Sequence, residues 1–181
     1  KEKFSRAQVA KLVEATMSLV VESRPGYESI LRVAREIDGE KVGDALRALA
    51  ADLKKKKKSD KAELVLELLA RSGEGSSDDR FSQAMIALKK SKLDTSPTSR
   101  ARDPALKLIE ELVAKNVDVV GLLKKERTIE LDARFYLGFH FVEQGEALGE
   151  DLLNEVIEKG GRTKLAKMAK NKLKLEADKD A

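Results

Sequence analysis

The side chains that could do chemistry are few in this sequence, and they form no recognisable catalytic set. His140 is the only histidine and the chain has no cysteine, which excludes a thiolate nucleophile and the common zinc sites. Carboxylates occur side by side at 78–79, 110–111 and 150–151. Neighbouring residues of a helix point about 100° apart, so these pairs do not converge as the carboxyl pair of a glycosidase must. The sequence therefore predicts no enzyme activity.

The two remaining candidates for a cofactor or metal site have simpler interpretations. Residues 73–75 read GEG and lack the longer glycine patterns that cradle phosphates, so a turn is predicted. His140 has no second histidine to complete a metal site and is interpreted as a partly buried helix residue between Phe139 and Phe141. No cofactor and no metal ion are expected.

A run of five lysines is the most conspicuous polar feature, formed by Lys54, Lys55, Lys56, Lys57 and Lys58. In a helix these side chains would wind around more than a full turn and could not form one flat stripe. One interpretation is a solvated helix end, where the helix dipole favours cations. The alternative is an electrostatic contact with nucleic acid, an acidic peptide or anionic lipid.

A second basic group lies in 162–175, which holds six basic residues and no acid. At helical spacing one face carries Lys164, Lys167, Lys170 (or Asn171) and Lys174. The opposite face carries Leu165, Met168, Ala169 and Leu173. This pattern predicts a basic amphipathic helix that caps a stack with a polar outer face. Phosphate contact is the alternative, but base readout is not expected because no aromatic residue interleaves with the lysines.

Aromatic residues cluster once, in the predicted helix 130–143, with Phe135, Tyr136, Phe139 and Phe141. Such a helix is apolar nearly all round and is typical of a central, buried element. Tyr136, Phe139 and His140 are therefore predicted either to pack in the core or to line a groove for a partner.

The composition predicts a charge-rich helical protein. The 181 residues are 41% hydrophobic, 4% aromatic and 38% charged, against about 25% charged in an average domain. The net charge is +4. No apolar run approaches the roughly 18 residues that span a bilayer, and no signal sequence is evident. With the lack of cysteine, this favours a cytoplasmic location. The first residue is Lys1, so a fragment of a longer protein is expected.

Ten helices are predicted from apolar periodicity and capping signals. Ser5, Asp103 (followed by proline) and Thr163 are predicted N-caps. Ser59-Asp60 is predicted to cap the helix 60–71, and Ser77 or Asp78 to start the helix 79–92. The segment 94–102 is polar and unperiodic and is interpreted as a mobile loop, and 176–181 as a frayed tail. The predicted helices are 5–22, 27–37, 40–56, 60–71, 79–92, 104–115, 117–125, 130–143, 147–159 and 163–175.

An internal repeat relates three of these helices at their C-terminal ends. The segments 64–73, 108–117 and 152–161 read LVLELLARSG, LIEELVAKNV and LLNEVIEKGG, with offsets of 108 − 64 = 44 and 152 − 108 = 44. Each has glutamate at its fourth position and a basic residue at its eighth. Such self-similarity predicts stacked helical hairpins at 5–37, 40–72, 78–116 and 130–160, with a last helix as a cap. An irregular helical bundle is the alternative.

Residues 133–149, ARFYLGFHFVEQGEALG, resemble the first helix and turn of a tetratricopeptide repeat. Leu137, Gly138, Phe141 and Gly145 match that family's leucine–glycine pair, aromatic and turn. Gly138 would let a neighbouring helix approach closely. The resemblance is best over Ala133–Leu175, and it implies a scaffold that holds a partner peptide or protein on a concave face.

The sequence also departs from that family. Arg134 stands where the family prefers tryptophan, and the small residue of the second helix falls on Gly149 or Glu150. The closing proline is absent. The offset of 44 exceeds the family's roughly 34 residues, whereas HEAT repeats of about 40–47 residues fit the spacing but lack the leucine–glycine pair.

The sequence thus predicts an all-α fold. More narrowly, it predicts one domain over 1–181, a short solenoid of about four hairpins plus a capping helix. The function expected of it is non-catalytic binding of a protein or peptide partner, as a scaffold or adaptor. The alternative is a basic helical domain that binds nucleic acid or another polyanion.

Overall fold

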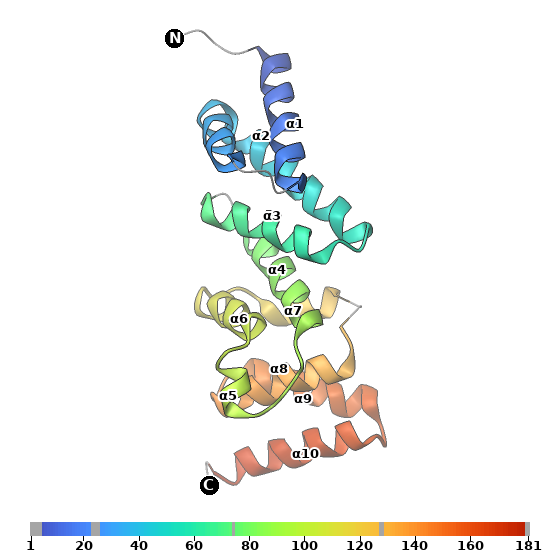
Figure 1. Ribbon diagram of the computed structural model, residues 1–181. Helices are drawn as coiled ribbons and strands as arrows, with labels where there is room; N and C mark the ends of the chain where they lie inside the picture. Colours follow the sequence, from blue (N-terminus) through green and yellow to red (C-terminus); the bar gives the residue numbers. More distant parts are fainter. Residues whose placement is uncertain (1–4, 23–25, 74, 127–128, 180–181) are drawn as a thin grey trace. The chain divides into compact units, whose positions relative to one another are not determined.

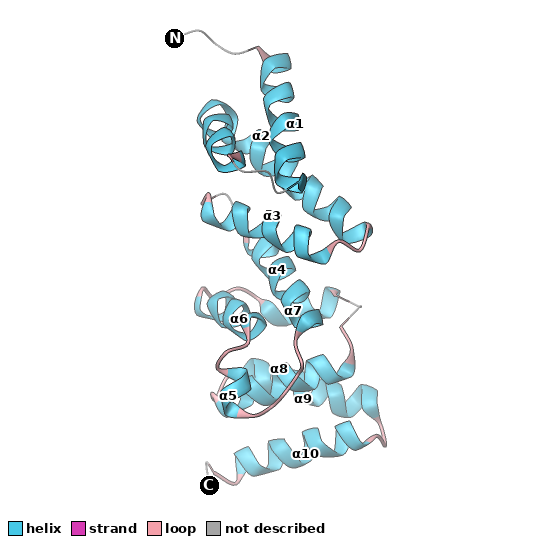
Figure 2. Ribbon diagram, in the orientation of Figure 1, coloured by secondary structure: helices cyan, strands magenta, loops and turns pink. Residues whose placement is uncertain are grey.

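The protein is entirely helical in the computed structural model, which describes residues 5–22, 26–73, 75–126 and 129–179 (Figures 1 and 2). No strand occurs in these ranges, which confirms the all-α prediction. None of the helices there is long and apolar enough to cross a membrane. The helices are α1 (Arg6–Glu22), α2 (Tyr27–Lys55), α3 (Ser59–Arg71), α4 (Ser77–Lys90), α5 (Pro97–Arg100), α6 (Pro104–Ala114), α7 (Val119–Lys125), α8 (Leu131–Glu143), α9 (Ala147–Gly160) and α10 (Lys164–Ala177).

The chain divides into two compact units, and the division falls inside α4, between Ile86 and Ala87. Unit 1 holds α1–α3 and most of α4; unit 2 holds the rest. The division falls within the first helix of the predicted hairpin 78–116. The solenoid and the single-domain organisation stay predictions.

In unit 1, α1 packs against α2, and α2 packs against α3. Helix α2 covers the two predicted helices 27–37 and 40–56. The break expected near Asp38 is present, since the backbone of Asp38 is non-helical (φ −157°, ψ 84°). The buried core of this unit includes Leu31, Val42, Leu46, Leu53, Val65 and Leu69.

The lysine run is not one helical segment: Lys54 and Lys55 end α2, and Lys56–Lys58 form the turn to α3. Lys57 has a left-handed backbone (φ +58°). The amide of Lys58 donates to the carbonyl of Leu53 at 2.9 Å, and that of Lys57 to Lys54 at 3.0 Å. This is the Schellman arrangement, in which glycine is the usual left-handed residue.

We therefore expect Lys57→Gly to stabilise the protein. Removing the left-handed penalty of a side chain gains about 1–2 kcal/mol, and the greater freedom of glycine in the unfolded chain returns about 0.4–1 kcal/mol. The net gain should be roughly 0.5–1 kcal/mol in the free energy of unfolding, measured by urea denaturation. Lys55→Gly, in the last turn of α2, is the matched control and should lose about 1 kcal/mol. Equal losses for both variants would contradict the assigned turn.

In unit 2, α9 packs against α7, α8 and α10, α8 also packs against α10, and α6 packs against α7. The closest approach is between α8 and α9. A Cβ atom built on Gly149 would lie 2.0 Å from the backbone nitrogen of Val142, and one built on Gly138 would lie 2.9 Å from Cγ of Leu153. The close approach predicted at Gly138 is confirmed.

Three of the predicted N-caps form. Ser5 and Gln8 exchange backbone–side-chain hydrogen bonds, Asp103 accepts from the amide of Ala105, and Thr163 accepts from that of Ala166. The cap predicted at Ser59-Asp60 is wrong, because both residues lie inside α3, whose N-cap position is Lys58 and carries no side-chain cap. Helix α4 begins at Ser77, as predicted. The segment 94–102, which was predicted to be a loop, includes the short helix α5 at Pro97–Arg100. Of the predicted tail 176–181, α10 includes the first two residues, and 180–181 lie outside the described residues.

The three repeated segments each end a helix, as predicted. Glu67 pairs with Arg71 at 2.5 Å in α3, and Glu155 pairs with Lys159 at 2.7 Å in α9. Gly73 and Gly161, which are equivalent in the repeat, both have positive φ. The equivalent of these glycines after α6 is a β-branched valine, and there the left-handed residue is Asn116, one position earlier. The repeat is therefore degenerate at its turns.

Candidate functional site

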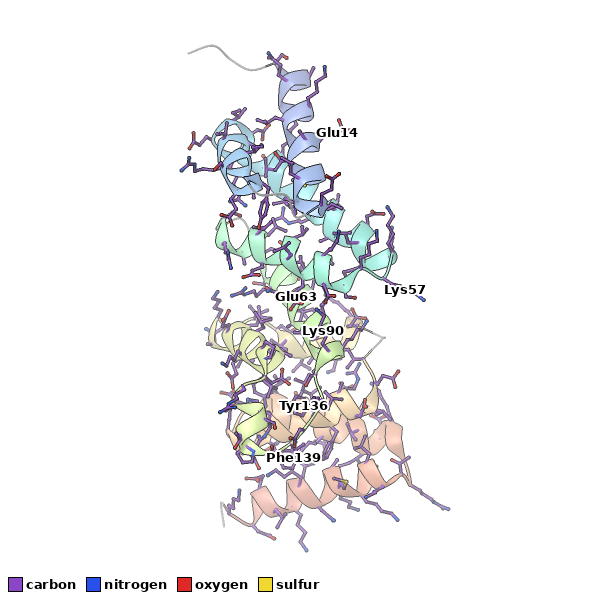
Figure 3. The ribbon with its side chains drawn as sticks, viewed as in Figure 1. Glu14, Lys57, Glu63, Lys90, Tyr136 and Phe139 are labelled. Atoms are coloured by element: carbon purple, nitrogen blue, oxygen red, sulfur yellow. The ribbon has the colours of Figure 1, made fainter. Side chains whose placement is uncertain are left out.

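The five lysines at the end of α2 and in the turn to α3 are all exposed. Figure 3 shows Lys57 extending outward from this turn. Lys56 pairs with Asp52, one turn before it, at 2.7 Å between Nζ and Oδ2. The lysines form a solvated charged turn, and the alternative of a polyanion contact remains a prediction.

The lysine face of α10 is present as predicted, with Lys164, Lys167, Lys170 and Lys174 exposed. The apolar face differs at two positions. Met168 was expected to point inward and is 43% exposed. Lys172, which the sequence did not single out, is buried, 8% exposed, beside Ala169. Lys172 can be buried at this position because its charge is paired with a carboxylate.

That partner is Glu143, at the end of α8. Its Oε1 accepts a hydrogen bond from Lys172 at 2.5 Å, and its Oε2 accepts one from Arg100 of α5. Both cations also lie over the ring of Phe139, with Nζ of Lys172 4.2 Å and Cζ of Arg100 5.1 Å from the ring centroid. Figure 3 labels Phe139 in this part of α8. We call these four residues the α5–α8–α10 clamp.

Electrostatics keep the clamp ionised at neutral pH. Burial by itself would raise the pKa of the Glu143 carboxyl, but hydrogen bonds from Lys172 and Arg100 outweigh it, and its pKa lies below the usual value. A carboxyl with a lowered pKa stabilises the fold above its ordinary pKa and loses that contribution as the pH falls through the lowered one. The clamp therefore connects the three helices at neutral pH, and its contribution to stability is lost only under acidic conditions, as Glu143 becomes protonated.

Of the three candidates Tyr136, Phe139 and His140, two are buried in the core and Phe139 belongs to the clamp. Tyr136 is 1% exposed and donates its hydroxyl to Asp103 at 2.8 Å; burial raises its pKa. Nε2 of His140 lies 2.7 Å from Oε1 of Glu110, and its Nδ1 lies 3.4 Å from Arg100. Tyr136 and His140 are both buried, which favours the core interpretation over a partner groove. Phe139 is partly exposed.

Arg134, at the position where the tetratricopeptide family prefers tryptophan, is also buried. Its Nη1 donates to Glu155 at 3.0 Å, and its Nη2 donates to the carbonyls of Leu123 and Glu126 at 3.2 and 3.3 Å. A guanidinium thus joins α8 to α9 and to the end of α7. Arg134 and Glu155 therefore form a largely buried ion pair in unit 2.

A cleft of about 690 Å³ lies beside the clamp, between the α8–α9 turn and the last turns of α10. Four glutamates line it, namely Glu143, Glu146, Glu150 and Glu176, with Val142, Leu173 and Ala177 as its apolar contacts. Lys179 is its one lining cation. We call it the acidic cleft.

The charge balance of the acidic cleft is negative. Helices α8 and α10 end at it, whereas α9 begins there, with Glu146 as its N-cap and Glu150 in its first turn. The positive end of the α9 dipole therefore offsets part of the negative ends of the other two helices. Glu143 and Glu176 are paired with Lys172, and Glu176 also with Lys179. Glu146 and Glu150 have no ion-pair partner within the described parts of the chain. Two carboxylates therefore remain to attract a cation from outside.

The sequence did not identify the acidic cleft. Its carboxylates come from three helices, and Glu150 was interpreted as charge near a helix N-terminus. In the described residues, no group of histidines and carboxylates is arranged to hold a metal ion. Comparison with protein-family models, with curated proteins and with solved structures finds no match for this chain.

Proposed function

We propose that this chain is a non-catalytic helical module that binds a partner protein, and that the acidic cleft receives a basic segment of that partner. The observation that carries the proposal is the pair Glu146 and Glu150, two carboxylates without an internal partner at the rim of a cavity. A volume of 690 Å³ lies within the roughly 300–1,000 Å³ of typical ligand sites. It is large enough for one or two long basic side chains.

The walls of the acidic cleft are held in place before a partner arrives. Gly149 lets α8 and α9 pack at backbone contact, and the clamp ties α10 to the end of α8. A preformed site loses little conformational entropy on binding. The apolar contacts of Val142 and Leu173 suit the methylene stems of lysine and arginine, whose charged ends would meet the carboxylates.

The scaffold that we propose is a tetratricopeptide-like helical repeat. The α8–α9 hairpin supports this proposal, because Gly138 stands where the family has a glycine and lies close to Leu153 of α9. The recurring ion pairs Glu67–Arg71 and Glu155–Lys159 support a repeat of about 44 residues. The hairpin lies within unit 2, and each of the two ion pairs lies within one helix.

The test is binding of a fluorescein-labelled peptide of alternating arginine and alanine, followed by anisotropy at physiological salt. The double variant Glu146→Gln/Glu150→Gln should weaken binding about tenfold, since each contact of this kind is worth roughly 0.5–1 kcal/mol. The matched control is Asp151→Asn/Glu158→Gln, which removes two exposed charges from α9 outside the cleft. Equal weakening by both pairs, or by neither, would overturn the proposal.

Polyanion binding is the second candidate function, favoured by the exposure of all five lysines from Lys54 to Lys58. Replacing them with a neutral mixture should leave binding of the basic peptide within a few-fold, because exposed charges that do not line the cleft are screened at physiological salt. If the turn binds polyanions, the same change should weaken binding of a duplex oligonucleotide and flatten its salt dependence. Tight duplex binding at physiological salt that depends on these lysines would favour the second candidate.

A further inference from the structure

We infer that the outer face of α10 is a second docking surface, whose partner is an acidic amphipathic helix. Helix α10 packs on α8 and α9 through its inner face, which includes Ala166, Ala169 and Lys172. Within unit 2, Figure 1 shows no further helix covering the other side of α10. The face that remains has both apolar and basic side chains in a regular order.

The apolar part of this face is unusual for the protein. Only three large hydrophobic side chains are exposed among the described residues, and two of them, Met168 and Leu175, lie on α10. They are 43% and 60% exposed. They are seven residues apart, which places them on one side of the helix two turns apart. Single exposed apolar residues are ordinary, but two on the same side of one helix are more typical of an interaction surface.

The basic part follows the same spacing. Lys167 precedes Met168, and Lys174 precedes Leu175, so the pair lysine–apolar recurs after seven residues. Lys167 and Lys174 lie along one side of the stripe that Met168 and Leu175 form, and Lys164 lies close to its line, whereas Lys170 lies on nearly the opposite side of the helix. None of the four has an ion-pair partner among the described residues, whereas Lys172, on the inner face, is paired twice.

Charge complementarity decides the class of partner. A helix with leucines at seven-residue spacing and glutamates beside them would cover Met168 and Leu175 and pair with the lysines, as the flanking charges of coiled coils do. A nucleic acid backbone would satisfy the lysines but leave both apolar side chains without a partner. A helix that lies on a membrane needs a broad apolar face, and the broad apolar face of α10 is buried against α8 and α9.

The experiment uses a labelled, stapled peptide helix with leucines seven residues apart and glutamates on both flanks. Binding should be measurable by anisotropy and should fall about tenfold in Leu175→Glu and again in Lys167→Glu/Lys174→Glu. Lys107→Glu, an exposed change on α6, is the matched control and should bind as the unmodified protein does. Circular dichroism and thermal unfolding check that the variants keep their fold.

The outcomes separate this inference from the proposed function. Glu146→Gln/Glu150→Gln, in the acidic cleft, should leave binding of the acidic helix unchanged, so either proposal can fail alone. Absence of binding at millimolar protein, or binding unaffected by Leu175→Glu, would overturn the inference. Stronger binding to phosphatidylserine vesicles or to a duplex oligonucleotide, lost in Lys167→Glu/Lys174→Glu, would also overturn it and assign the face to that ligand.

Discussion

Replacing Phe141 with alanine is expected to lower the free energy of unfolding by about 3–5 kcal/mol, the usual cost of deleting a buried aromatic ring. The side chain is 1% exposed, and its ring meets that of His140 edge-on, with centroids 5.0 Å apart. The variant loses both the burial of the ring and this contact, and it leaves a cavity.

Urea denaturation measures the Phe141→Ala effect. Leu175→Ala, which truncates a residue that is 60% exposed, is the control and should change stability by no more than about 0.5 kcal/mol. Similar midpoints for Phe141→Ala and the unmodified protein would show that the ring does not pack in the interior of unit 2.

Replacing Gly149 with alanine should destabilise the protein, although the same change in an open helix would stabilise it by about 1 kcal/mol. The new Cβ atom would lie 2.0 Å from the backbone nitrogen of Val142 and 2.5 Å from its Cα. Backbone atoms cannot rotate away as a side chain does, so α8 and α9 must separate. We expect a loss of about 1–3 kcal/mol or more, as for other overpacked interiors.

The sign of the Gly149→Ala effect is therefore diagnostic. Glu150→Ala, at the exposed neighbouring position, controls for helix propensity and should be nearly neutral. A gain in thermal stability for Gly149→Ala would mean that the two helices do not meet at backbone contact. The loss should be accompanied by weaker binding at the acidic cleft, whose walls include the α8–α9 turn.

Local patterns predicted the parts of the fold that depend on neighbouring residues. The N-caps Ser5, Asp103 and Thr163 and the break at Asp38 each depend on side chains or backbone within a few positions. The close approach at Gly138 was predicted because only glycine leaves that space. Each of these features is decided by the residue itself.

Contacts distant in sequence caused the errors. Helical spacing placed Met168 inward, but Lys172 is the residue buried beside Ala169, because Glu143 on another helix neutralises its charge. The segment 94–102 was interpreted as mobile because it has no apolar anchor. Its anchor is Arg100, held by the same glutamate and by the ring of Phe139. No single-sequence pattern shows that these three segments meet.

The candidate site could not be predicted for the same reason. Its carboxylates are ordinary surface residues in the sequence, and what distinguishes Glu146 and Glu150 is their place beside a cavity between two helix ends. The lysines of α10 were identified correctly as an exposed face. The two apolar residues on which the proposed docking surface depends, Met168 and Leu175, could be identified only from their exposure in the structure.

The most direct measurement of the central claim is an NMR titration of the ¹⁵N-labelled protein with the peptide of alternating arginine and alanine. Amide shifts should change first and most at residues 142–150 and 173–179, around the acidic cleft. A peptide of alternating glutamate and alanine should leave the amides of 142–150 unchanged, and any shifts that it causes should follow the outer face of α10. Shift changes confined to other surfaces, or equal changes with both peptides, would contradict the claim that this cleft binds a basic partner segment.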